Sequence, residues 1–230
     1  STDFDSVGEE YTEIDRNQQF LTVESELDGS RFVSVTNRND FSLNPNRLDL
    51  DLGIISPIPM TSTIIQDQIE LSQEFRLESE EGTELDWVLG AFYADSEING
   101  DATRFFGITE RTQYSLESKN LAIFSSLGRD LSDKDYVSLG LRYDKFEKEM
   151  QRTKTSVMLP GGSLTIPGSN DFSALSPSLQ WEHSFSEELT GNARVTYAEK
   201  PGGFSPYTNN PNRIAFSEEE TMAYEVSMLF

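Results

Sequence analysis

His183 is the single histidine of this 230-residue chain and its one side chain able to act as an imidazole base. A lipid-cleaving enzyme could pair such a base with a serine nucleophile near a membrane surface. The chain has no Gly-x-Ser-x-Gly sequence, and alternation places His183 between Trp181 and Phe185 on an apolar face beside a short connection. We therefore interpret it as a histidine at a membrane–water interface and predict no catalytic residue and no enzyme.

Metal ligands are also sparse in the sequence. Asn46, Asp49 and Asp51 lie close together and could offer oxygen ligands to calcium, but the EF-hand spacing and its closing glutamate are absent. Without cysteine there are no thiolate sites, and one histidine cannot form a multi-histidine site. Glycine pairs at 161–162 and 202–203 lack a phosphate-binding pattern. We expect no resident metal or cofactor.

The charge of the chain limits its partners. There are 18 basic and 40 acidic residues, which gives a formal net charge of −22. A surface of this sign repels phosphate backbones, so nucleic acid is excluded as a partner. The apolar fraction is 36%, and no run approaches the roughly 18 apolar residues of a membrane helix.

Apolar residues instead recur with a period of two, which predicts strands. The clearest segment is 136–146, where Val137, Leu139, Leu141 and Tyr143 share one face. The same pattern predicts further strands near 18–27, 30–40, 64–78, 85–97, 112–128, 175–185, 188–199 and 222–230. Most reach the roughly 9–11 residues of a membrane-spanning strand. The expected fold is all-β, an antiparallel up-and-down meander of about nine strands in one domain over 1–230.

Short and long connections alternate along the chain. The short ones are expected at 28–30, 79–85, 129–135 and 186–188, and the long ones at 41–63, 98–111, 151–171 and 200–217. Short turns at one end and long loops at the other are typical of an outer-membrane barrel with an aqueous lumen. The alternative is a soluble β-sandwich, in which the same alternation would mark one buried face.

Several segments, in this order, resemble the barrel of TonB-dependent outer-membrane receptors. They are QIELSQEFRL at 68–77, LDWVLGAFY at 85–93, LGLRYDKFEKE at 139–149, LSPSLQW at 175–181, VTYAEKPGGFSP at 195–206 and EETMAYEV at 219–226. The resemblance runs from about residue 18 to 230. It is carried by the set and its order, because each segment alone is only moderately specific.

The resemblance implies a 22-stranded barrel plugged by an N-terminal domain in the outer membrane of a Gram-negative bacterium. Such receptors take up scarce nutrients, most often ferric siderophores, with energy from the TonB complex. This chain is expected to be a central barrel segment without the plug domain and the last barrel strands. Its implied partners are outer-membrane lipid, a small-molecule ligand such as a ferric siderophore, and the TonB complex through the missing plug region.

Ligand-binding residues are expected in the external loops. Ferric siderophores often carry negative charge and aromatic catechols, which favour guanidinium groups and aromatic rings. The candidates are Arg104, Phe105, Phe106, Tyr207 and Arg213. Alternatively, these side chains only pack the loops on one another. Two other functions stay open, a small passive outer-membrane pore or structural barrel protein and a soluble β-sandwich binding module.

Overall fold

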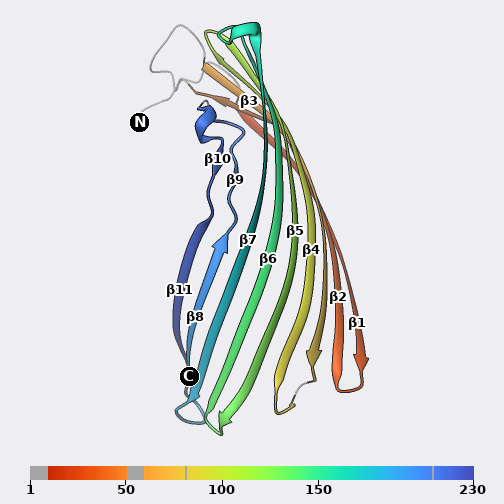
Figure 1. The fold of residues 1–230 in the computed structure, drawn as a ribbon, viewed down its shortest axis with the longest axis vertical. Helices are drawn as coiled ribbons and strands as arrows, with labels where there is room; N and C mark the ends of the chain where they lie inside the picture. Colours follow the sequence, from red (N-terminus) through yellow and green to blue (C-terminus); the bar gives the residue numbers. More distant parts are fainter. Residues whose placement is uncertain (1–9, 51–59, 81, 209) are drawn as a thin grey trace.

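The computed structural model describes residues 10–50, 60–80, 82–208 and 210–230, and most of these lie in strands. Nine strands form one antiparallel sheet, a tall curved wall in Figure 1, in the order β1-β2-β3-β4-β5-β6-β7-β8-β11. They are β1 (Tyr11–Leu27), β2 (Ser30–Asp49), β3 (Met60–Ser79), β4 (Asp86–Phe106), β5 (Thr109–Ser132), β6 (Asp135–Ser156), β7 (Ser163–Ser184), β8 (Thr190–Lys200) and β11 (Glu219–Leu229). The predicted antiparallel meander of about nine strands is confirmed.

The remaining elements are short. A 3-10 turn, η1 (Pro160–Gly162), lies between β6 and β7. Between β8 and β11 the chain forms β9 (Gly203–Phe204), η2 (Pro211–Arg213) and β10 (Ala215–Phe216), and β9 pairs with β10. None of the described helices is long and apolar enough to cross a membrane.

Most of the predicted long connections are wrong, because the strands continue through them. β4 reaches Phe106 and β5 begins at Thr109, so only two residues connect them where the sequence predicted a loop over 98–111. β6 and β7 likewise extend to Ser156 and from Ser163, which shortens the expected 151–171 loop. In the first predicted loop, residues 51–59 lie outside the described residues. The connection between β8 and β11 is the long one that the described residues retain.

The length of the strands explains this error. β6 has 22 residues, which corresponds to about 70 Å, more than twice a hydrocarbon core of about 30 Å. Only the part that faces lipid needs outward apolar side chains. Beyond it the backbone ladder continues while both faces are polar, so the alternation that marks a strand in the sequence fades.

The outer face carries an apolar band near the short connections. One cross-strand row runs through Phe75, Ala91, Ile123, Tyr143 and Leu175, and four of these five residues are large and exposed. Such a band is what a lipid-facing barrel wall presents. We call the end of the sheet with the short connections the turn end and the opposite end the far end.

Beyond this band, toward the far end, the outer face of β4 to β6 becomes polar. Lys145 forms an ion pair with Glu147 at 3.0 Å, two and four residues beyond Tyr143 on the same strand face. Farther along, Arg111 forms an ion pair with Asp101. The sheet therefore projects past the apolar band on one side.

The inner face of the sheet is largely polar. At the level of the apolar band, the Arg142 guanidinium donates two hydrogen bonds of 2.8 Å to Asp144, which also accepts one of 3.2 Å from Asn120. The Cζ of Arg142 lies 5.3 Å from the ring centroid of Phe92 and 5.6 Å from that of Phe124. Inward polar groups satisfy one another here, as expected for a wall that faces water or protein rather than lipid.

A flap extends from β8 and β11 toward the far end, where Figure 1 shows β9 and β10. We define the flap as residues 203–208 and 210–216. It is held together by the pairing of β9 with β10 and by a hydrogen bond of 2.7 Å from the Ser205 amide to the Ile214 carbonyl. Phe204 packs against Gly168 of β7, where an added Cβ would lie 2.7 Å from the ring. The flap thus lies on the inner face of the sheet.

Candidate ligand-binding site

The structure brings together two of the predicted ligand residues, Arg104 and Tyr207. Arg104 is near the end of β4, and its Cζ lies 5.5 Å from the centroid of the Tyr207 ring in the flap. A guanidinium at this distance from an aromatic face is attracted by the ring quadrupole. The pair therefore joins the flap to the wall.

Tyr114 of β5 extends this contact across the sheet. Its ring meets that of Tyr207 edge to face, with centroids 5.4 Å apart, and the two hydroxyl groups are hydrogen-bonded. The Tyr114 hydroxyl also donates to Gln66 Oε1 at 2.9 Å. Burial, and next the bond with Tyr207, raise the pKa of Tyr114 well above its usual value, so the phenol stays neutral.

A glycine makes this reach possible. Gly100 of β4 is paired with Gln66 on one side and Tyr114 on the other. A Cβ at Gly100 would overlap the ring and hydroxyl of Tyr114. The missing side chain lets the Tyr114 ring lie across β4 and bring its hydroxyl to Gln66.

Basic side chains lie beside this aromatic pair on the same inner face. Arg152 of β6 is paired with Tyr114 in the strand register, and 4% of its surface is exposed. Lys154, two residues farther along β6, forms an ion pair of 2.9 Å with Glu110. We call Gln66, Arg104, Tyr114, Arg152 and Tyr207 the inner cluster.

The sequence did not single out Gln66, Tyr114 or Arg152. Gln66 and Tyr114 belong to predicted strands rather than loops, and Arg152 lies in the predicted loop over 151–171. The one signal in the sequence that could have found Tyr114 and Arg152 is residue type. Each is a tyrosine or arginine at a position that the alternation assigns to the inner face, beyond the apolar part of its strand. Without the register of β3 to β6, nothing indicates that these positions meet.

The other predicted residues do not join the cluster. Phe105 follows Arg104 on β4, so its side chain lies on the opposite, outer face. Phe106 is the last residue of β4 and is exposed. Arg213 is exposed in η2, where its amide donates to the Asn210 carbonyl at 3.0 Å. None of these three predicted residues is therefore part of the group around Tyr207.

His183 lies near the turn end of β7, as its sequence position predicts. Its Nδ1 is 2.8 Å from Asp135 Oδ1, and the Trp181 Nε1 donates to the same oxygen at 3.1 Å. The imidazole and the Phe185 ring are nearly perpendicular to each other, with centroids 4.7 Å apart. The serine hydrogen-bonded in this group, Ser132, donates to Asp135 rather than to the histidine. The histidine is therefore paired with an aspartate and an aromatic ring, and no serine is hydrogen-bonded to it among the described residues.

The calcium hypothesis gains no support from the described part of the chain. Asn46 accepts a hydrogen bond of 3.0 Å from Thr12, and the Asp49 amide donates to Glu10. Asp51 lies outside the described residues. Within the described ranges, no three histidine, aspartate or glutamate side chains are grouped so that they could hold a metal ion.

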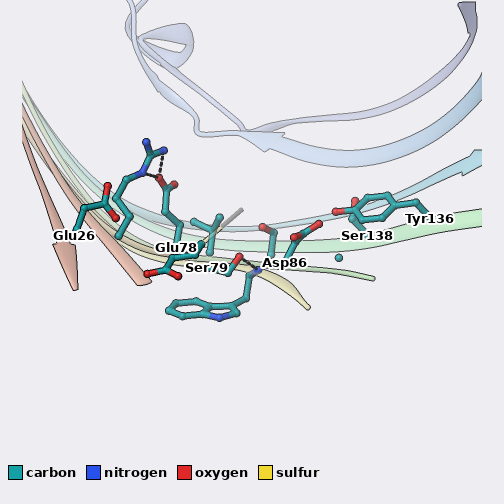
Figure 2. Close-up of a pocket in the computed structure, with 12 residues that line it drawn as sticks. Glu26, Glu78, Ser79, Asp86, Tyr136 and Ser138 are labelled. Carbon is teal, nitrogen blue, oxygen red and sulfur yellow. Dashed lines mark hydrogen bonds and ion pairs between the residues drawn. The ribbon is translucent and has the colours of Figure 1, made fainter. Parts of the chain in front are cut away.

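A hollow lies on the inner face at the turn end. This open cavity has a volume of about 590 Å³. Glu26, Glu78 and Asp86 are among its lining residues, as Figure 2 shows. Arg31 donates to Glu78 at 2.6 Å, and the Trp87 amide donates to Ser79 Oγ at 3.1 Å. The cavity is acidic and its main cation is already paired, so it offers an anion little. The inner cluster is the better candidate for binding a ligand.

The comparisons with known proteins agree with this architecture. A family model described as TonB dependent receptor-like, beta-barrel, matches residues 1–229. The ferric yersiniabactin uptake receptor FyuA from Yersinia pestis is 16% identical, with a TM-score of 0.82, over 95% of this chain and 34% of that one. The siderophore receptor PiuA from Acinetobacter baumannii is 13% identical, with a TM-score of 0.67, over 95% of this chain and 38% of that one.

At these identities the likeness to the two solved structures concerns the fold. The chain spans about a third of the length of each receptor. A comparison with curated protein sequences finds no match.

Proposed function

Because the chain belongs to the TonB-dependent receptor β-barrel family, we propose that it forms part of the wall of an outer-membrane receptor for an anionic iron chelate of the ferric-siderophore class. In this proposal the complete protein, in the outer membrane of a Gram-negative bacterium, takes up the chelate with energy from the TonB complex. The wall itself performs no covalent chemistry.

The single observation that carries this proposal is the contact of Arg104 with Tyr207 beside Tyr114 on the inner face. A chelate with catecholate or carboxylate oxygens presents negative charge and flat rings. Guanidinium groups and aromatic rings recognise both features. The alternative is that these residues only pack the loops on one another. Packing alone does not require Arg104, Arg152 and Lys154 to gather on the inner face of a chain with a net charge of −22.

The position of the cluster supports the same function. On β6 the apolar band of the outer face ends near Tyr143, because Lys145 and Glu147 follow on the same face, and Arg152 of the inner cluster lies beyond it toward the far end. In an outer-membrane barrel the short turns face the periplasm, so the far end faces outward. The cluster would therefore meet a ligand before it reaches membrane depth.

The test uses the complete natural protein in a Gram-negative host that lacks its own siderophore receptors. Uptake of radiolabelled iron is measured with ferric citrate and with a ferric tris-catecholate. We expect Arg104→Ala to lower uptake at limiting chelate at least tenfold, because it removes a charge-assisted contact worth about 1.5–3 kcal/mol. Tyr207→Ala should act in the same direction.

The matched control is Arg111→Ala. Arg111 lies at a similar height of the sheet but on the outer face, where it pairs with Asp101. This variant loses the same charge on the face away from the ligand, so we expect uptake to change less than twofold. Equal loss in both variants, or uptake that persists when TonB is deleted, would contradict the proposal, and the second result would favour a passive pore.

A further inference from the structure

Among the described residues, Arg152 is a buried cation that forms no ion pair. Only 4% of its surface is exposed, and its Nε has no hydrogen-bond partner among the described residues. The carboxylate that acts on its charge, Glu110, is already ion-paired with Lys154. Burial lowers the pKa of Arg152, and Glu110 opposes this only in part. A guanidinium stays protonated in proteins, so the buried charge persists.

An unpaired buried charge is costly, and folded proteins rarely retain one. Its surroundings here deepen the deficit. Arg104 of β4 lies on the same inner face and adds a second positive charge, while Glu110, the carboxylate that acts on Arg152, already pairs with Lys154. An anion from outside the described residues would resolve this imbalance.

The flap covers the place where such an anion would bind. Tyr207 packs against Tyr114, which lies directly opposite Arg152 in the strand register. On the other side, Phe204 packs against Gly168, which is paired with Met150, two residues from Arg152 on the same strand face. Arg152 therefore lies beneath the flap, between its two aromatic contacts.

We propose that Arg152 is the principal anion-binding residue of this receptor and holds a pair of adjacent anionic oxygens of the iron chelate after Tyr207 moves off Tyr114. The planar guanidinium matches such oxygen pairs, whether carboxylate or catecholate, through two parallel hydrogen bonds. This inference rests on the proposed function and adds to it the residue and the charge of the ligand.

The test compares three chelates of known charge on the complete purified protein in detergent. Ferric citrate and a ferric tris-catecholate are anionic, whereas ferrioxamine B is cationic. Equilibrium dialysis with radiolabelled iron gives each Kd. We expect the natural protein to prefer the anionic chelates, and Arg152→Gln to weaken their binding at least tenfold without weakening ferrioxamine B. Arg152→Lys should recover part of the preference, because it keeps the charge but loses the fork.

Stability separates a binding role from a structural one. Arg152→Gln removes an unsatisfied buried charge, so the variant without ligand should unfold on heating no earlier than the natural protein. A structural arginine would give an earlier transition. Arg111→Gln, which removes the same charge from the outer face, is the control and should leave every Kd within twofold.

The outcomes distinguish this inference from the proposed function. If the natural protein binds chelates and Arg152→Gln keeps the same affinities and preference, the inference is wrong and the proposed function stands. If no chelate binds but iron-free citrate raises the unfolding temperature of the natural protein and not of Arg152→Gln, the anion site stands and the proposed function fails. If neither chelate nor citrate binds, both are wrong.

Discussion

The guanidinium of Arg104 lies over the ring of Tyr207, 5.5 Å from Cζ to the ring centroid, and joins β4 to the flap across the inner face. The hydroxyl of Tyr207 makes a second connection, to Tyr114. We predict that Tyr207→Ala, which loses both, raises amide hydrogen exchange over residues 203–208. Tyr207→Phe keeps the ring and should raise it less. Equal exchange in the three proteins would mean that the other contacts of the flap hold it without Tyr207.

Gly100 leaves the space that Tyr114 occupies. We predict that Gly100→Ala destabilises the barrel by about 1–3 kcal/mol, because a methyl group there forces the tyrosine ring aside. Urea unfolding of the complete protein in lipid vesicles measures this. The double variant Gly100→Ala with Tyr114→Ala should cost less than the sum of the two single changes, since the clash needs both groups. Strict additivity would contradict the overlap.

Asp144 is 5% exposed and accepts two hydrogen bonds from Arg142 on the inner face. We predict that Asp144→Asn destabilises the barrel by about 1–3 kcal/mol, because charge-assisted bonds are lost and a partly buried guanidinium is left unpaired. Adding Arg142→Gln should restore part of the loss. The same vesicle unfolding measures both, and a double variant worse than Asp144→Asn would contradict this explanation.

Ile123 of β5 belongs to the outer apolar band and is 60% exposed. If lipid covers this band, Ile123→Arg should cost about 2–4 kcal/mol. Gln113→Arg places the same group on the same face of β5, beyond the band and beside Asp101, and should be nearly neutral. A similar cost at both positions would place the bilayer elsewhere on the wall.

His183 contacts Asp135 and Phe185 at the turn end, remote from the inner cluster. We predict that His183→Ala leaves iron uptake within twofold of the natural protein. Loss of uptake at unchanged amounts of protein in the outer membrane would assign the histidine a functional role. It would also reopen the question of chemistry at the interface.

The sequence predicted well the part of the wall that carries the apolar band. At 136–146 and 175–185 one face must meet a uniformly apolar medium, so each second residue is apolar and the alternation reveals the strand. It failed where that demand ends. The continuation of β4 through Arg104 and of β6 through Arg152 has polar residues on both faces, and hydrogen bonding between strands leaves no mark on side-chain type.

The candidate site shows the same division. Arginine and aromatic residue types were enough to select Arg104 and Tyr207, because the recognition of anionic chelates depends on side-chain chemistry. They also selected Phe105. Phe105 lies one residue after Arg104 on β4, so its side chain is on the outer face. A shift of one residue moves a side chain to the other side of a sheet.

By itself, the sequence determined the fold class, the apolar outer band and the absence of an enzyme-like motif, since each follows from residue type and local spacing. Only the tertiary structure decided that Tyr114 and Arg152 join Arg104 and Tyr207. That meeting depends on the pairing of β3 to β6 and on the return of the flap to the inner face. Both are long-range contacts, which no local pattern of residues encodes.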